Sequence, residues 1–345
     1  RVLALLLLAS SSRALAADQL SFGPGPAWVS PKAIPTTPNA PAEAPVGVLL
    51  NDQQIKFEPG KTTIYVETAI KIQNGQGLAA GNVSLPWDPA TDSVTVHKLH
   101  IVRGDQTIDV LKNGQTFTTL RREQNLDAAM LDGRLTANIQ PEGLQEGDVL
   151  VLATSLEHRD PVLKDHIDAR FANWNGVPFK SARVRLLWPS RIKLKVQQAN
   201  LPSAKPVVRG GETQLEIAME DGQPLIVPSG APLRFTVGRY GEASDFASWA
   251  EVAELIAPHY RAASVIPASG ALRDEGEKIR RVADRGQQVE QALALVQERV
   301  RYVALLMGEG GYVPASAEST WSRRFGDCKG KTALLLGILH ELGIK

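Results

Sequence analysis

Polar and apolar residues alternate along the chain between residues 47 and 240. A period of two places successive side chains on opposite faces of a strand, so this pattern indicates half-buried strands. The clearest alternation predicts strands over residues 62–72, 94–101, 148–156, 183–188, 192–196 and 214–219. Turn sequences such as Asn74-Gly75, Asn113-Gly114 and Gly210-Gly211 separate them. The pattern predicts an antiparallel β-sandwich over 47–240, with residues 126–135 as a short helix or a bulged connection.

From residue 241 the apolar period lengthens to between three and four residues, which is typical of amphipathic helices. Ser244 is expected to cap a helix that ends at Ala257-Pro258, because proline interrupts a helix interior. Further helices are predicted around 274–283 and over 290–306, the second with an apolar stripe of Val289, Leu293, Val296, Val300 and Val303. A loop bearing Tyr312, Pro314 and Trp321 is expected to follow. Residues 241–345 are therefore predicted to be a second, mainly helical domain.

The last predicted helix positions the only cysteine of the chain. Asp327 is a good N-cap, Gly343 is a natural end, and the apolar stripe between them falls at residues 334, 335, 338, 339 and 342. Cys328 therefore lies in the first turn, where unpaired backbone N–H groups favour a thiolate, as do the neighbouring Lys329 and Lys331. These features suit a thiol nucleophile, whereas the alternative interpretation is a small buried hydrophobic residue.

Charge and composition exclude several classes of protein. A formal net charge of +1 predicts no electrostatic attraction to nucleic acid or acidic lipid. A single cysteine excludes an intrachain disulfide and a cysteine-based zinc cluster, and no pattern implies a metal or an organic cofactor. No segment is apolar over enough residues to predict a membrane-spanning helix.

The chain begins with an apolar run over residues 2–9, followed by three serines and Ala14-Leu15-Ala16. This pattern is typical of the end of a signal peptide and its cleavage site, so residues 1–16 are expected to be a partial signal peptide. The protein is accordingly expected to be periplasmic or secreted in a bacterium. Residues 17–46 contain seven prolines and are predicted to be an extended or turn-rich lead-in.

The residues around Cys328 resemble a known nucleophile region. Tyr312-Val313-Pro314, Thr320-Trp321 and the sequence RRFGDCKGK over 323–331 are similar to bacterial transglutaminase-like proteins. The resemblance implies a papain-like α+β fold with a Cys-His-Asp triad in which Cys328 is the catalytic nucleophile. Residues 109–150, including Gly147-Asp148-Val149-Leu150, resemble the β domain of unknown function that often precedes such domains. The fold class expected is therefore multidomain α and β, a β-sandwich followed by the helical first half of a papain-like domain.

The resemblance implies acyl transfer on a peptide or amide substrate, with water the expected acceptor (peptidase or amidase) and an amine (cross-linking) the alternative. In this superfamily the histidine and aspartate come from strands after the nucleophile helix. His340 lies about 18 Å along the same helix from Cys328 and cannot reach it, and His259 could approach only through tertiary folding. The chain is therefore expected to be part of a longer protein that supplies both residues downstream.

Two aromatic residues near the nucleophile are candidates for the walls of a substrate cleft. Tyr312 and Trp321 flank the predicted nucleophile segment, and packing of the loop is the alternative role for both. The competing function is a non-catalytic binding or envelope-assembly protein with a degenerate papain-like core.

Overall fold

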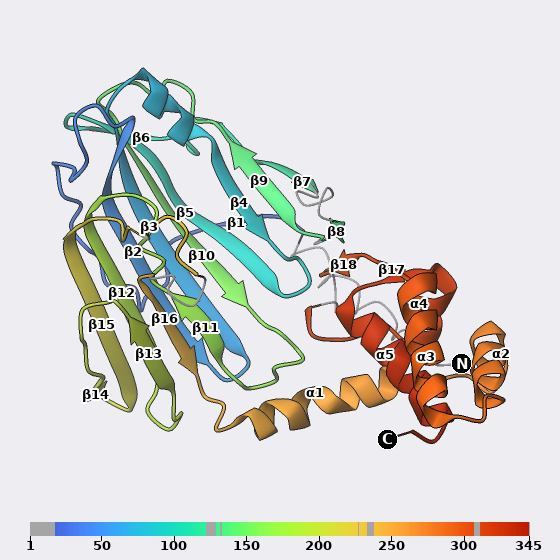
Figure 1. The fold of residues 1–345 in the computed structure, drawn as a ribbon. Helices are drawn as coiled ribbons and strands as arrows, with labels where there is room; N and C mark the ends of the chain where they lie inside the picture. Colours follow the sequence, from blue (N-terminus) through green and yellow to red (C-terminus); the bar gives the residue numbers. More distant parts are fainter. Residues whose placement is uncertain are drawn as a thin grey trace, which may run out of the picture. The chain divides into compact units, whose positions relative to one another are not determined.

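The computed structural model describes residues 18–121, 129–131, 133–226, 228–232, 238–306 and 311–344. The predicted partial signal peptide lies outside the described residues. The chain divides into a β unit, made of the residues up to 120 and 135–246, and a helical unit, made of 121–134 and the residues from 247 onward. The expected multidomain α and β fold is confirmed, with a large N-terminal sheet and a C-terminal helical part (Figure 1).

Nine strands of the described residues form the large sheet of the β unit. Their spatial order is β1 (Ser21–Phe22), β5 (Asp92–Arg103), β10 (Val149–His158), β3 (Lys61–Ile72), β2 (Val46–Glu58), β12 (Phe179–Pro189), β15 (Glu212–Gly222) and β14 (Val207–Arg209), with β6 (Gln106–Asp109) also paired to β5. The expected antiparallel arrangement is corrected at two pairs, because β2 runs parallel to β12 and β1 runs parallel to β5. One edge of β2 is paired with β3 in a hairpin, so the later strand β12 pairs with the other edge, and it runs in the same direction as β2.

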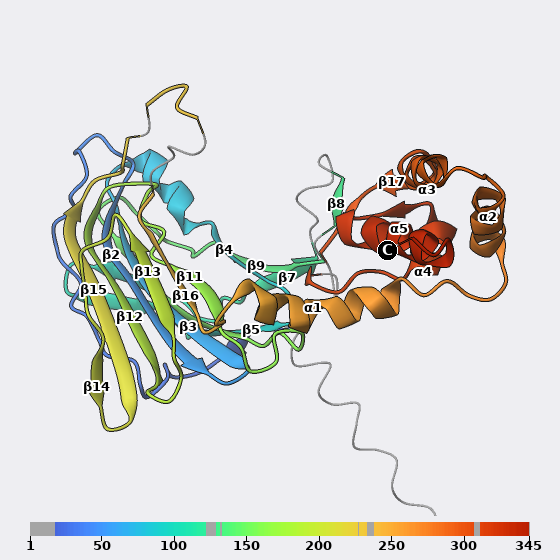
Figure 2. The ribbon, with the colours of Figure 1, turned by 60° about the horizontal axis from the view of Figure 1, so that its bottom comes forward.

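Two smaller sheets accompany the large one (Figures 1 and 2). One consists of β4 (Val83–Trp87), β9 (Leu135–Ile139) and β7 (Thr118–Arg121), and the other of β11 (Asp168–Phe171), β16 (Tyr240–Ser244) and β13 (Lys195–Ala199). A 3-10 helix, Gly75–Gly81, follows β3 at the turn predicted from Asn74-Gly75. Residues 192–194, predicted as strand, precede β13 instead.

The two small sheets pack on the same face of the large sheet. Cross-strand pairing lines up Leu186, Ile55, Ile64, Leu156 and Val94 in one apolar row over five strands. The Ile55 end of this row belongs to a core that includes residues of β11 and β16, and the Val94 end to a core with residues of β4 and β9. Sheet-on-sheet packing therefore covers this face over these five strands.

The opposite face of the large sheet is polar. One row of paired residues on this face reads Arg183, Asp52, Glu67, Ala153 and Lys98 across the same five strands. The acidic Asp52 and Glu67 are cross-strand neighbours, and each has a basic partner: Arg183 pairs with Asp52, and Lys98 reaches past Ala153 to Glu67 over 2.8 Å. The lead-in segment of residues 21–32 lies against this face, as the hydrogen bonds described below show.

The helical unit is built around α5. Its helices are α1 (Trp249–Ala263), α2 (Ala271–Arg280), α3 (Arg285–Arg299), α4 (Ala317–Arg323) and α5 (Cys328–Glu341). Two short parallel strand pairs accompany them: β17 (Arg301–Tyr302) with β19 (Phe325–Gly326), and β18 (Ala304–Leu305) with β8 (Met130–Leu131). The core contains apolar residues of α2, α3, α4 and α5, among them Leu272, Ile279, Ala292, Val296, Trp321, Leu334 and Ile338.

Several predicted helix boundaries are wrong. Ser248, not Ser244, caps α1, because Ser244 pairs in β16. Pro258 lies inside α1, whose tertiary packing outweighs the hydrogen bond that proline removes. The predicted helix 290–306 ends as α3 at Arg299, because the residues that follow pair as β17 and β18.

Two further expectations in the helical unit are corrected. The apolar stripe of α3 is shifted, since Ala292 and Val296 are buried whereas Val289 and Leu293 are exposed. The loop expected before the nucleophile contains α4, which Ser316 caps. Of the segment 126–135, residues 126–128 and 132 lie outside the described residues, while Met130–Leu131 form β8 and Leu135 begins β9. No helix among the described residues has the length and apolar character needed to cross a bilayer.

Tight packing between Phe179 and Gly222 gives a first prediction. The two residues pair across β12 and β15, and a Cβ on Gly222 would lie 2.0 Å from Phe179 Cζ. Because this buried ring would have to move, we expect Gly222→Ala to lower the free energy of unfolding by about 1–3 kcal/mol in urea denaturation. The control is Gly176→Ala, since nothing lies within 4 Å of that position. Equal stability of the two variants would contradict this packing.

A His–Asp pair at the end of the large sheet predicts pH dependence. His158 Nδ1 lies 2.6 Å from Asp92 Oδ1, and this hydrogen bond raises the pKa of His158 although burial opposes the shift. Burial is the largest single influence on Asp92 and acts to raise its pKa. The hydrogen bonds from His158, the Asp88 N–H and Thr91, together with the charge of His158, outweigh burial, so the pKa of Asp92 is lowered.

The raised pKa of His158 stabilises the fold fully below the ordinary value of about 6.5, and this contribution is lost as pH rises through the raised value. The lowered pKa of Asp92 adds stability above about 3.8 that is lost at lower pH. We therefore expect His158→Gln to lower the melting temperature more at pH 5.5 than at pH 9. In an Asp92→Asn background, His158→Gln should change the melting temperature equally at the two pH values. If His158→Gln has the same effect at pH 5.5 and pH 9 in the wild-type background, the ion pair contributes nothing to stability.

Candidate active site

Cys328 is the first residue of α5, as the sequence predicts. Asp327 is the N-cap, with an extended backbone, and its Oδ1 accepts a hydrogen bond of 2.8 Å from the N–H of Gly330. The helix ends at the expected glycine, Gly343, whose positive φ of 67° lets its N–H bond to the carbonyl of His340. Leu334 and Ile338 of the predicted stripe are fully buried.

The segment that leads to Cys328 is held by close packing. Arg324 ends α4 in the left-handed conformation, with φ 61°, and β19 then pairs with β17. A Cβ on Gly326 would lie 2.9 Å from Thr320 Cγ2, and one on Gly330 would lie 2.8 Å from Thr320 Oγ1. Thr320 thus fills the space that these two glycines leave on either side of Asp327 and Cys328. The position of the thiol is therefore set by the backbone and not by a flexible loop.

The thiol is accessible while its cap is not. Cys328 is exposed, and Asp327 is only 5% exposed. Lys329 forms an ion pair with Asp327, and Lys331 donates a 2.6 Å hydrogen bond to the carbonyl of Val300. Both lysines that were expected to support a thiolate therefore have other partners.

Tyr260, in the last turn of α1, is a site residue that the sequence analysis missed. Burial raises its pKa, and negative charge on Cys328 raises it further. The phenol therefore remains a hydrogen-bond donor in the environment of the sulfur. A close approach of α1 to α5 brings it there, because a Cβ on Gly337 would lie 2.5 Å from the carbonyl oxygen of Ser264. The sequence prediction ended this helix at Ala257-Pro258, and it therefore did not include Tyr260.

A pocket of about 650 Å³ borders the cap. It is lined by Leu131 of β8, Leu305 of β18, Asp327, and residues of the segment before α5: Val313, Pro314, Ala315, Ser316, Ser319, Arg323 and Phe325. Its walls are mostly apolar, with a charged group at two points, which suits a peptide side chain.

The two expected cleft aromatics lie elsewhere. Trp321 is a core residue, 4% exposed, and the Arg324 guanidinium lies 3.6 Å from the centre of its ring. Tyr312 is exposed on the segment before α4. Neither side chain is among those that line the pocket, so Trp321 has the packing role that was its alternative.

The described residues supply few candidates for a base or a metal ligand near the thiol. None of the described histidines forms a hydrogen bond with Cys328, including His259 on α1 and His340 near the end of α5. In the part of the chain that the structure describes, no cluster of three or more His, Cys, Asp or Glu residues could hold a metal ion.

Comparison with known families identifies a domain in the β unit. Residues 58–226 match the family described as a domain of unknown function with solved structure, DUF3857. The match includes most strands of the large sheet, and it also spans residues 121–134, which belong to the helical unit. No curated protein matches the chain.

Among solved structures, the chain is similar to one described as "a putative protease" from Parabacteroides distasonis ATCC 8503. The identity is 11% and the TM-score 0.68, over 87% of this chain and 59% of the other. The likeness shows a shared fold, and the chain spans less than two thirds of that protein's length. An M1 zinc metallopeptidase from Deinococcus radiodurans also matches, at 12% identity over 57% of this chain and 42% of the other, with a TM-score of only 0.28.

The cap gives a prediction for the site. Asp327→Ala removes the side-chain acceptor of the Gly330 N–H and leaves Lys329 without its carboxylate. We expect the free energy of unfolding of the helical unit to fall by about 1–2 kcal/mol, whereas Asp327→Asn, which keeps a capping oxygen, retains most of it. Denaturation followed by hydrogen exchange of the α5 amides measures both variants. Full stability of Asp327→Ala would show that the cap is dispensable.

Proposed function

We propose that the chain carries the nucleophile of an exported cysteine peptidase or amidase of the transglutaminase-like superfamily. The observation that carries this proposal is the exposed thiol of Cys328 at the first position of α5, directly after the buried Asp327. The position offers sulfur to a substrate and places it beside the N–H groups of the helix start. The sequence around Cys328 and the fold shared with the Parabacteroides distasonis protein support the same conclusion.

The proposed chemistry is acyl transfer. The Cys328 sulfur attacks the carbonyl carbon of a peptide or amide bond, and N–H groups of the helix start stabilise the oxyanion. The C–N bond then breaks, the amine leaves with a proton, and the acyl group remains on sulfur as a thioester. Water attacks the thioester, releases a carboxylic acid and restores the thiol. The protein is proposed to act in the periplasm or outside the cell, on a peptide or protein substrate.

Two groups assist the sulfur in this proposal. The Tyr260 phenol, kept neutral by burial, donates a hydrogen bond to the thiolate or to the developing oxyanion. An imidazole and its carboxylate partner come from the strands that follow the nucleophile helix in this superfamily. The imidazole removes the thiol proton and returns a proton to the leaving amine.

The test compares a chain of residues 17–345 with the full-length protein that contains it, each with and without Cys328→Ala. Because this chain has one cysteine, iodoacetamide labelling of residues 17–345 reports on Cys328 alone. We expect this chain to be alkylated without hydrolysing peptides. The full-length protein should hydrolyse them, and Cys328→Ala should lower turnover by about 10⁴-fold or more.

Two outcomes would contradict this proposal. Turnover that survives Cys328→Ala would place the nucleophile elsewhere. An unreactive thiol together with an inactive full-length protein would favour the alternative, a binding or envelope-assembly protein with a degenerate core. Cysteine-dependent turnover by residues 17–345 would instead keep the nucleophile and assign the base to this chain, with His259 the first residue to substitute.

A further inference from the structure

The polar face of the large sheet contains buried charges that need partners. Asp52 and Arg183 are 1% and 7% exposed, and the guanidinium binds the carboxylate through two hydrogen bonds of 2.7 and 2.9 Å. Gln54, next on this face of β2, is fully buried and donates to Asp52 over 2.9 Å. Buried polar groups of this kind destabilise a fold unless each is satisfied. Some of the hydrogen-bond partners of these buried groups come from a segment outside the sheet.

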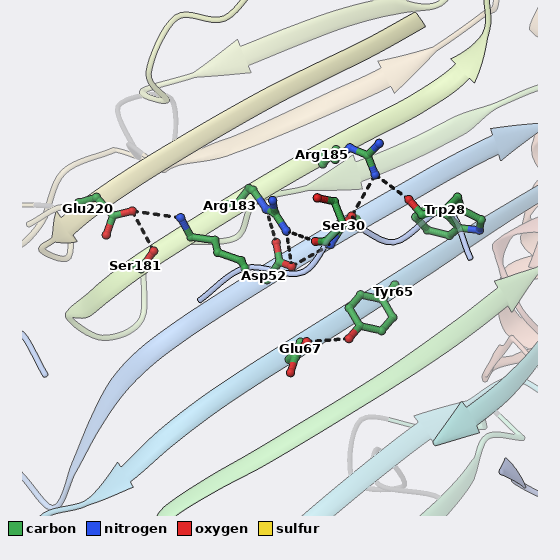
Figure 3. Close-up of polar contacts among 11 residues, drawn as sticks. Trp28, Ser30, Asp52, Tyr65, Glu67, Ser181, Arg183, Arg185 and Glu220 are labelled. Atoms are coloured by element: carbon green, nitrogen blue, oxygen red, sulfur yellow. Dashed lines mark hydrogen bonds and ion pairs between the residues drawn. The ribbon is translucent and has the colours of Figure 1, made fainter. Parts of the chain in front are cut away.

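The remaining partners belong to the lead-in segment, residues 21–32, which we call the strap (Figure 3). The N–H of Ser30 donates to Gln54 Oε1 over 3.0 Å, and the Ser30 carbonyl accepts from Gln54 Nε2 over 2.8 Å. The same carbonyl accepts from Arg183 Nη2 over 2.5 Å. The carbonyl of Trp28 accepts from Arg185 Nη1 over 2.8 Å. Each of these contacts uses the backbone of the strap.

Backbone contacts also hold the start of the strap. His97 Nδ1 donates to the carbonyl of Gly23 over 2.9 Å, while the other ring nitrogen of His97 lies 2.7 Å from Ser155 Oγ. Ser21 and Phe22 pair with β5 as the two-residue strand β1. At the far end, Lys32 forms an ion pair with Glu220 of β15, and this contact is made through a charged side chain.

The recognition is therefore directed at the backbone of the strap, with little demand on side chains. The strap includes a turn, in which the N–H of Val29 donates to the carbonyl of Pro26 over 3.0 Å. Prolines 24, 26 and 31 suit recognition through the backbone, because proline favours an extended chain and has no N–H that burial would leave unpaired.

The linker to β2, residues 33–45, includes exposed Thr36 and Thr37 and two prolines around them, Pro35 and Pro38. Its second half is held to the sheet, because Asn39 Nδ2 donates to the carbonyl of Phe179 and Gln73 Nε2 donates to the carbonyls of Pro41 and Ala44. At about 3.3–3.6 Å per residue, the first half, residues 33–38, can span roughly 20 Å when extended.

We propose that the polar face is a recognition surface for the backbone of the proline-containing strap, and that the strap of a second copy of the chain can occupy it in place of the chain's own. A terminal segment can be exchanged between copies with its contacts to the polar face kept, because both copies offer the same partners. When no second copy is present, the strap of each chain binds its own polar face through the same contacts. Tethering favours this because it gives the strap a high effective concentration at that face. This proposal is independent of Cys328.

The first experiment tests whether the surface accepts a strap in trans. A specific protease site placed between Thr36 and Thr37 allows the strap of the full chain to be cut after folding, and a fluorescent peptide of residues 18–34 is then added. We expect the labelled peptide to replace the cut strap. A peptide with Ser30→Ala keeps every backbone group and should bind within about twofold, whereas Ser30→Pro loses the N–H to Gln54 and should bind about tenfold more weakly.

The second experiment tests exchange between copies. Two populations of uncut chain with different affinity tags are mixed at high concentration, and co-purification and molar mass by light scattering are measured. We expect the two tagged chains to form a dimer, and we expect the 18–34 peptide to dissociate it by competing for the polar face. Gln54→Leu should weaken both peptide binding and dimer formation, whereas Lys56→Ala, on the same strand but paired with Glu212, should change neither.

Three results would overturn the proposal or part of it. A cut strap that never exchanges, in a protein whose circular dichroism is unchanged, would make the strap a permanent part of the fold. Peptide exchange without any mixed dimer would leave a peptide-binding surface but exclude a second copy as its partner. Equal peptide binding by the Ser30→Ala and Ser30→Pro peptides would contradict recognition through the backbone.

Discussion

The buried carboxylate of Asp327 is the contact on which the candidate site depends. It caps α5 through the N–H of Gly330, holds Lys329, and fixes the point at which the chain turns from β19 into the helix. The next residue, Cys328, is consequently presented at a helix start with its sulfur in solvent. Thr320 and the flanking glycines make the turn compact. By fixing where α5 begins, the Asp327 cap thus fixes the position of the Cys328 thiol.

The β unit follows a different constraint, because its large sheet has one apolar and one polar face. Alternation predicted β3, β5, β10, β12 and β15, since their polar and apolar residues separate cleanly. It did not predict β2, whose run Asn51-Asp52-Gln53-Gln54 reads as a polar loop. Asp52 and Gln54 of this run are buried because the strap and Arg183 supply hydrogen bonds. A strand that is polar on a covered face cannot be recognised until the covering segment is known.

The sequence alone could predict only those features of the site that depend on residues close to one another in the chain. The cap, the helix and Cys328 are neighbours in sequence, so the residues around them specify the geometry. The role of Trp321 as a core residue and the approach of Tyr260 depend on how α1 and α4 pack on α5, which no local pattern encodes. The helix errors have the same origin: Pro258 is tolerated in α1, and α3 ends at Arg299 because the next residues find strand partners.

As the proposed nucleophile, Cys328 should form a covalent bond with the substrate. Intact-mass spectrometry of the full-length protein, quenched in acid during turnover of a slowly hydrolysed ester or amide, measures this bond. We expect a mass increase equal to the acyl group, mapped by digestion to the peptide that contains Cys328 and removed by hydroxylamine as a thioester should be. Turnover without an adduct on Cys328, or with the acyl group on another residue, would contradict the proposed role.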